Sequence, residues 1–423
     1  MKTMKTKHLS IVFALISLVV LISGCADNDS TIANVEDNDF QPIVLTQEQE
    51  TMVSAGNAFA MTLLEKVNAE QKGSFIISPI SLQFVLGMVL NGAEGEVADE
   101  ICRVLGFGSG EMEAVNDFYS RLIHELPDLD KLTQFTTVRS GLSSVNEPLK
   151  QSYIDAVSSK YEALFESVDF INNPQAVREK VNLWCSQNTN GMIPEMITEA
   201  ETKDLGQVAL MLLDATWFKG VWNIPFEKKN TEHGRFTRED GSTCRVPFMK
   251  SDGRMNVSGG SIYRAVKKYY GNGAYSMTVI LPDKNDGVES VLALLHDGRD
   301  LVFSTQSTEL WLPKFEIETS VDNYIPILNG MGMKKVFVDG ALTQVFERRD
   351  IGCLNLIKQK SAIKVDEIGT EAASVTEAVV MDGSLIPNNS NSKVIFHADH
   401  PFIYLITEES TGTILFAGVY RGE

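Results

Sequence analysis

The side chains that most often carry catalysis form no local catalytic motif in this chain. Its 423 residues contain no GxSxG, HExxH or GxxxxGKS/T segment, the signatures of serine hydrolases, zinc peptidases and phosphate-binding loops. A glycine-rich turn at 106–110 fails the dinucleotide-binding spacing because Glu111 stands where the third glycine should be. His397 and His400 are three residues apart, but Pro401 ends any helix that could bring both onto one metal ion. The sequence therefore predicts no metal, no cofactor and no enzyme. A hydrolase with a triad of distant residues stays open as an alternative.

The most informative stretch of the sequence is the segment 366–387, which joins a possible strand to a loop that a protease could cut. Within it, the residues that would share one face of a strand are small: Thr370, Ala372, Ser374, Thr376, Ala378 and Val380. The opposite face would carry Glu371, Ala373, Val375, Glu377, Val379 and Met381. A period of two is that of a strand, but Ala, Ser and Glu are poor strand formers on their own. The segment therefore reads as a conditional strand, with a short helix as the alternative.

The far end of this segment has the composition of an exposed loop. Asp382-Gly383-Ser384 is followed by the polar run 387–392, and proteolysis concentrates at such tips.

Residues 1–24 read as a signal peptide rather than as part of the fold. Three lysines precede the short apolar run Ile11–Ile22, which is the pattern of a secretory signal. Its end, LISGC, resembles a bacterial lipobox, which predicts cleavage before Cys25 and lipidation of that thiol. Residues 25–44 are expected to form a flexible tether. We therefore expect an exported cell-envelope lipoprotein, periplasmic or on the cell surface, attached to the membrane through Cys25 or released from it.

The charge and the cysteines narrow the choice of partners. The net charge of −19 becomes −22 once three signal-peptide lysines are removed, which argues against nucleic acid and for a monomer. The four other cysteines have no metal-ligand spacing, and we expect buried free thiols, with two disulfides as the alternative. They are Cys102, Cys185, Cys244 and Cys353.

The elements that position the segment 366–387 suggest an α+β domain over 45–423. Helical patterns gather in the first half of the chain and strand patterns in the second. Helices are expected at 47–63, 81–90, 92–105, 149–160, 176–188 and 321–331. Strands are expected at 74–78, 208–217, 245–249, 275–281, 309–315, 361–365, 393–396, 402–408 and 414–420. Asp214 is the only acid inside a long apolar strand, so it should have a specific partner.

Several separated segments together resemble the serpin family, from Leu45 almost to the C-terminus. They are NAFAMTLLEKV, SFIISPISLQFVLGMVLNGAEGEVADEI, VNLWCSQNTNGMIPEMI, LLDATWFKGVWNIPF, LPKFEIE, LNGMGMKKVF, FHADHPFIYLI and ILFAGVY. The resemblance implies three β-sheets, eight or nine helices and an exposed reactive-centre loop, the segment 366–387. It also implies suicide inhibition: a serine or cysteine protease cuts the loop, which then inserts into the large sheet before the acyl-enzyme hydrolyses.

The resemblance assigns roles to individual residues. The hinge of the loop corresponds to Gly369, Thr370, Glu371, Ala372, Ala373 and Ser374. The breach, where insertion begins, holds Trp222. The shutter, farther along the sheet, holds Ser78, Ser81, Asp214 and Gln359. The family usually has Asn and His at the last two positions, and we hypothesise that Asp214 and Gln359 pair as a replacement. The alternative is that each contacts a serine or water.

The reactive bond is expected within Val380–Leu385. The family spacing from the hinge glycine gives Gly383–Ser384, and Met381–Asp382 is the second choice because Met381 suits a protease pocket better. No Arg or Lys lies between Asp366 and Ser392, so elastase-, chymotrypsin- or subtilisin-like targets are favoured over trypsin-like ones. A hinge free of Pro and bulky residues on its small face favours an inhibitor. A non-inhibitory binding protein with this fold on the cell envelope is the alternative.

Overall fold

The computed structural model describes residues 38–283, 287–296, 301–348, 352, 354, 356–370 and 393–422. This part contains eight α-helices: α1 (Gln47–Glu70), α2 (Pro79–Leu90), α3 (Gly95–Val104), α4 (Met112–Glu125), α5 (Gln151–Tyr161), α6 (Pro174–Asn188), α7 (Val288–His296) and α8 (Ile325–Gly330). Short 3-10 helices include η2 (Ala200–Gln207), which precedes β4. None of the described helices is long and apolar enough to span a membrane.

One sheet has six strands. In spatial order these are β10 (Phe315–Val321), β11 (Gln359–Val365), β12 (Gly369–Thr370), β4 (Leu210–Val221), β2 (Thr133–Ser144) and β3 (Leu164–Val168). β2 and β4 pair over most of their length, and β10 pairs with β11 over seven residues. This six-stranded sheet corresponds to the sheet that, by the serpin resemblance, the loop would enter.

The other strands form one continuous nine-stranded sheet. Its order is β1 (Phe75–Ile77), β15 (Ile414–Tyr420), β14 (Phe402–Glu408), β8 (Tyr275–Pro282), β7 (Tyr263–Tyr270), β6 (Thr243–Gly259), β9 (Ser304–Pro313) and β13 (Val394–His397), with β5 (Glu232–Thr237) paired to β6. The first half of the long strand β6 pairs with β5, and its last residues pair with β7. A small sheet of β5, β6, β9 and β13 thereby continues into a larger one. The α+β fold with three sheets is confirmed, and two of them share β6.

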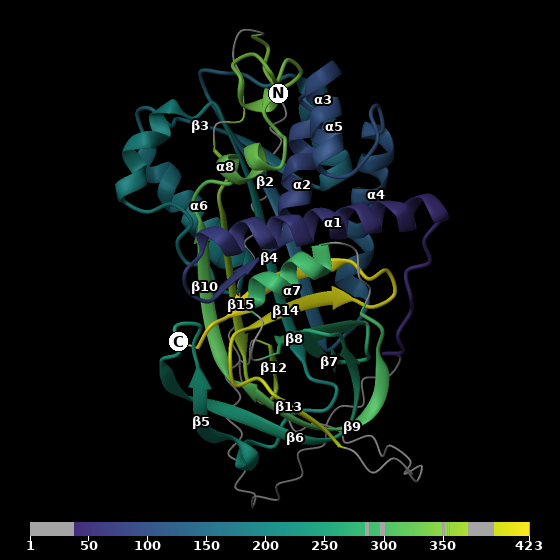
Figure 1. Ribbon diagram of the computed structural model, residues 1–423. Helices are drawn as coiled ribbons and strands as arrows, with labels where there is room; N and C mark the ends of the chain where they lie inside the picture. Colours follow the sequence, from purple (N-terminus) through teal and green to yellow (C-terminus); the bar gives the residue numbers. More distant parts are fainter. Residues whose placement is uncertain are drawn as a thin grey trace, which may run out of the picture.

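Helix α2 occupies the centre of the molecule. Every one of its residues is buried, as its unbroken apolar sequence predicts. Its N-terminus is capped by the Ser78 side chain, with Pro79 in the first turn. It packs against β4 of the six-stranded sheet and β15 of the nine-stranded sheet. Figure 1 shows most helices gathered in the upper half, with β5, β6, β9 and β13 at the lower end.

Several predicted elements have different ends in the structure, and two of these differences, at 309–315 and 321–331, change how the chain is divided into elements. The helix expected at 321–331 starts only at Ile325, because Val321 is the last residue of β10 and pairs with Gln359. The strand expected at 309–315 is broken at Lys314, whose backbone N–H donates to Pro247. Residues 309–313 lie in β9 of the nine-stranded sheet, whereas Phe315 begins β10 of the six-stranded sheet, and a single apolar pattern did not distinguish the two.

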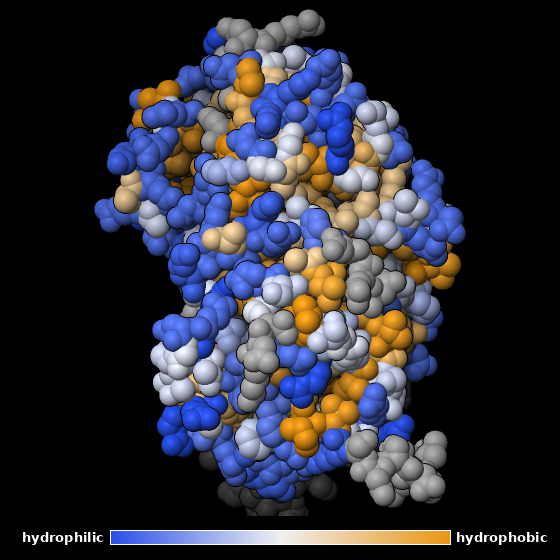
Figure 2. Space-filling view, viewed as in Figure 1, coloured by the Kyte–Doolittle hydropathy of each residue, from blue (hydrophilic) through white to orange (hydrophobic). Residues whose placement is uncertain are grey.

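The last residues of the predicted tether pack against the domain. Asn38 donates to the Asp130 carboxylate at 2.9 Å and accepts from the backbone N–H of Lys131 at 2.8 Å. Ile43 is buried, and its N–H donates to the Ser410 hydroxyl at 2.9 Å. Residues 38–44 therefore belong to the folded body. Figure 2 shows that hydrophilic side chains cover most of the face it draws, with smaller hydrophobic patches between them.

Candidate functional site

The predicted site lies where the six-stranded sheet is incomplete. In the described part, β4 and β11 are joined through only two residues, Gly369 and Thr370, which make up β12. Gly369 pairs with Val221, and Thr370 pairs with both Gly220 and Val365. Beyond this end, the facing edges of β4 and β11 carry no strand pairing to each other. Among the described residues, the sheet is therefore open between β4 and β11 beyond β12, and this opening is called the gap below.

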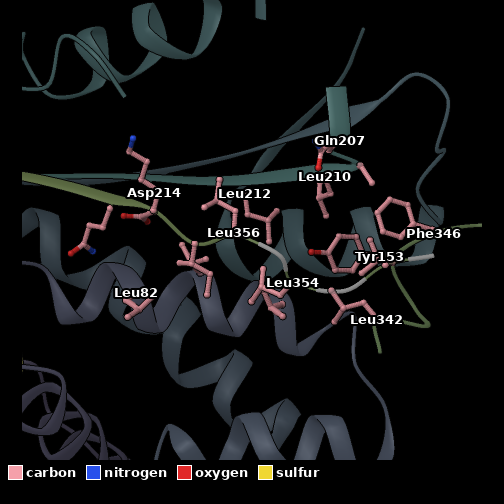
Figure 3. Close-up of a pocket in the computed structure, with 18 of the residues that line it drawn as sticks. Leu82, Tyr153, Gln207, Leu210, Leu212, Asp214, Leu342, Phe346, Leu354 and Leu356 are labelled. Carbon is pink, nitrogen blue, oxygen red and sulfur yellow. The ribbon is translucent and has the colours of Figure 1, made fainter. Parts of the chain in front are cut away.

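A cavity of about 310 Å3 lies beside the gap, under the half of β4 farthest from β12. Most of the residues that line it are apolar and come from α2, β4 and the described residues of 339–359, as Figure 3 shows for Leu82, Leu210, Leu212, Leu354 and Phe346. Asp214 lies at one end of this row of side chains. Gln359 lines the same cavity from the β11 side. The open sheet therefore has an apolar floor with polar groups at the shutter.

Thr370 of the predicted hinge already points inward. Its side chain is 1% exposed, and its hydroxyl lies 2.6 Å from the hydroxyl of Tyr270 on β7. Gly369 precedes it where a Cβ atom would lie 1.9 Å from the backbone oxygen of Gly220. The hinge needs glycine here because the two strands approach closely, and not only because glycine is flexible.

Trp222 of the predicted breach holds the chain that leads into the hinge. Its indole N–H donates to the backbone oxygen of Asp366 at 2.9 Å, and its backbone N–H donates to Ile368 at 2.7 Å. Its ring stacks on Tyr270 at 4.3 Å. The structure therefore brings Trp222, Tyr270 and Thr370 into one cluster.

At the shutter, Gln359 is bonded to Ser78 and Tyr324. Its amide donates to the backbone oxygen of Ser78 at 2.9 Å and accepts from the Ser78 N–H at 3.1 Å. The Tyr324 hydroxyl donates to the same amide oxygen at 3.0 Å. Ser78 also donates its hydroxyl to Leu415 at 2.9 Å. These bonds tie β11 to the N-terminus of α2.

Asp214 is bonded to a different set of partners on its own side of the gap. Its carboxylate accepts from the hydroxyls of Ser81 at 2.6 Å, Thr216 at 2.5 Å and Thr137 at 3.2 Å. Arg139 lies 3.6 Å from the same carboxylate, and both side chains are 1% exposed. The expectation that Asp214 has a specific partner is confirmed.

The hypothesis that Asp214 pairs with Gln359 is wrong. Each side chain finds hydrogen-bond partners on its own side of the gap, and the alternative that each contacts a serine holds. The reason is geometric, because the two residues lie on strands that are not joined at this level. Arg139, Tyr270 and Tyr324 were missed. The single acid Asp214 in an apolar strand indicated that a partner existed, but it did not indicate which residue in the sequence that partner was.

The other predicted site residues lie outside the described part of the chain. They are Cys25, Glu371, Ala372, Ala373, Ser374, Met381, Asp382, Gly383 and Ser384. Three of the predicted free thiols are described: Cys102 and Cys185 are buried and Cys244 is half-buried, all without a disulfide. Burial raises the pKa of the Cys102 thiol to about 11 and that of Cys185 to about 12, so these two thiols are protonated at neutral pH.

Relatives of known identity cover nearly the whole chain. The tick protein Iripin-2 of Ixodes ricinus is 29% identical over 387 residues, covering 88% of this chain and 94% of its own. Serpin-ZX of Arabidopsis thaliana is 28% identical, covering 86% and 97%. Serpin B6 of Macaca fascicularis is 28% identical, covering 87% and 98%.

Solved structures have the same fold. Serpin48 of the insect Tenebrio molitor superposes with a TM-score of 0.77 at 24% identity, covering 90% of this chain and all of its own. An Arabidopsis serpin, AtSerpin1, described as being in a native stressed conformation, gives 0.75 at 26% identity, covering 89% and 98%. The profile of the family described as serpin (serine protease inhibitor) matches residues 54–421. Proteins of this family are generally protease inhibitors and not enzymes. The chain belongs to the serpin family.

Proposed function

We propose that this protein is an inhibitory serpin, which traps a serine protease by inserting its cleaved loop between β4 and β11. The observation that carries the proposal is β12. Thr370 already pairs with both flanking strands and points under the sheet, so insertion has a defined starting point and direction. Cysteine proteases form an acyl-enzyme too and are a second class of target.

The pairing of β12 sets a register for the rest of the loop. Continued one residue at a time, it would place Ala372 opposite Phe218 and Ile363, and Thr376 opposite Asp214 and Gln359. In paired strands, opposite residues point to the same face. The small residues at alternate positions would then all lie under the sheet, where space is limited.

The same register would place the acids of the loop on the outer face. Glu371 would lie between Lys219 and Lys364, which flank its position on β4 and β11. Opposite charges on neighbouring strands are stabilising, by roughly 0.2–1 kcal/mol a pair. In this register the loop would be complementary to the gap in side-chain size and in charge.

Target and place of action are proposed from the loop and the N-terminus. With Gly383–Ser384 as the reactive bond, or Met381–Asp382 as second choice, the targets are elastase-, chymotrypsin- or subtilisin-like proteases. Export and lipidation at Cys25 would hold the inhibitor at the cell envelope, where proteases from outside the cell are met.

The test is to mix the protein with elastase, chymotrypsin, subtilisin and papain and to analyse the products by denaturing electrophoresis. The expected result is a band at the summed mass that survives SDS and is absent when the protease is first blocked at its nucleophile. Plain cleavage of the loop by all four, without such a band, would contradict inhibition and support a non-inhibitory binding protein. Sequencing the released C-terminal peptide identifies the reactive bond.

A further inference from the structure

Arg139 on β2 is buried and held from several sides. Its side chain is 1% exposed. Its Nε donates to the backbone oxygen of Tyr161 at the end of α5, and its Nη1 donates to the Thr137 hydroxyl at 2.8 Å. The guanidinium lies 5.5 Å from the centre of the Phe84 ring on α2. An arginine fixed by two helices and a strand presents its charge in one direction.

That direction is toward Asp214. The guanidinium Nη1 lies 3.6 Å from Asp214 Oδ2, and Thr137 accepts from Arg139 and donates to the same carboxylate oxygen. Burial raises the pKa of Asp214, and the nearby Arg139 charge opposes this. Burial likewise lowers the pKa of Arg139, and Asp214 opposes it. Each group therefore needs the other, because an uncompensated buried charge is strongly destabilising.

The ion pair with Arg139 also keeps the Asp214 carboxylate away from Gln359. Across the gap, Gln359 uses its amide on Ser78 and Tyr324. One hydrogen of its NH2 group is bonded to Ser78, and no described residue accepts the second, so a released carboxylate could accept it. A bond from Asp214 to Gln359 would join β4 to β11 where the incoming strand must pass.

We infer that Arg139 is a positioning residue for loop insertion: it holds the Asp214 carboxylate against Ser81 and Thr216, so that the gap between β4 and β11 stays open at the shutter. The inference rests on the proposed function and adds a residue to it. It explains why this chain carries an acid at 214, since the acid and the arginine form one unit.

The experiment measures insertion without requiring a trapped protease. Thermolysin is metal-dependent and forms no acyl-enzyme, so it cuts the loop and leaves it free to insert. The rate of insertion is followed by tryptophan fluorescence, since Trp222 and Trp217 lie on or beside β4. The variants are Arg139→Met and the double variant Arg139→Met/Asp214→Val, with exposed Arg254→Met on β6 as the matched control.

We expect Arg139→Met to insert about fivefold more slowly or worse. The double variant should recover most of the wild-type rate, since valine at 214 needs no counter-charge and cannot bond to Gln359. Arg254→Met should be unchanged. An Arg139→Met protein that inserts at the wild-type rate or faster would overturn the inference. If Arg139→Met does not fold, the double variant decides: wild-type insertion supports the unit, and slow insertion or failure to fold refutes it.

The two claims fail differently. If the wild-type protein inserts its cleaved loop but forms no SDS-stable complex with any protease, inhibition is wrong and the role of Arg139 is still tested by the insertion rates. If complexes form and Arg139→Met inserts normally, only the inference about Arg139 fails.

Discussion

At the scale of single residues, Thr370 fixes the geometry of the reactive segment. Its buried side chain reaches Tyr270 under the sheet, so every second residue after it would take the same inward direction. Gly369 before it is packed against Gly220 with no room for a Cβ atom. The face of small residues predicted from the sequence would therefore point under the six-stranded sheet.

Thr370→Arg should convert the inhibitor into a substrate. An arginine here would place an unpaired charge under the sheet beside Tyr270, so insertion would stall and hydrolysis would win. The measurement is the ratio of SDS-stable complex to cleaved inhibitor, expected to fall at least tenfold. Thr243→Arg on the exposed start of β6 is the control. Undiminished complex with Thr370→Arg would contradict the inward direction of the hinge.

Gln359→Ala should destabilise the native protein by about 1–3 kcal/mol. The change leaves the Ser78 N–H and C=O and the Tyr324 hydroxyl without their buried partner. The free energy of unfolding from urea titration measures this, with Gln306→Ala on the exposed part of β9 as control. An unchanged value would mean that water replaces the amide at no cost.

At the scale of elements, the six-stranded sheet is held across its gap by few contacts. One of them is on η2, before β4, where Glu201 receives a hydrogen bond from Lys358, just before β11, at 2.7 Å. Partial burial raises the pKa of Glu201, but hydrogen bonds from Lys358 and Thr198 outweigh it and lower the pKa to about 2. The pair spans the two sides that must separate around an inserting strand.

Acid should weaken the interaction between Glu201 and Lys358. Because the folded pKa of Glu201 lies below its ordinary value of 4.5, its stabilisation is present above pH 4.5 and is lost as the pH falls toward about 2. Glu201→Gln should therefore lower the melting temperature at pH 6 and have a smaller effect at pH 3. The effect should be modest since Glu201 is partly exposed. An equal effect at both pH values would show that the charge of Glu201 is not involved.

At the scale of the whole molecule, the fold was predictable and the state of the sheet was not. The apolar segment 81–90, the strand around Asp214 and the closing hairpin 402–420 have local patterns, and each is present in the structure. The hinge and Trp222 followed from resemblance, and the structure places Gly369, Thr370 and Trp222 at the end of the gap. The partners of Asp214 did not follow, because Ser81, Thr137 and Arg139 are 133, 77 and 75 positions away in sequence.

The pairing assumed between Asp214 and Gln359 failed for a related reason. The two residues face each other only if β4 and β11 are joined, and the sequence gives no sign that the sheet is open there. A period of two residues indicates a strand, but whether that strand has a neighbour is a property of the assembled sheet. For the same reason the cavity beneath β4 could not be predicted.

The central claim is that the native sheet lacks a strand that the cut loop supplies. The most direct measurement is the melting temperature before and after cleavage of the loop by thermolysin, with the cut protein kept intact otherwise. The added strand would complete the hydrogen bonding of β4 and β11, so cleavage should raise the melting temperature, and Thr370→Arg should abolish the rise. An unchanged or lower melting temperature after complete cleavage of the wild-type protein would contradict insertion.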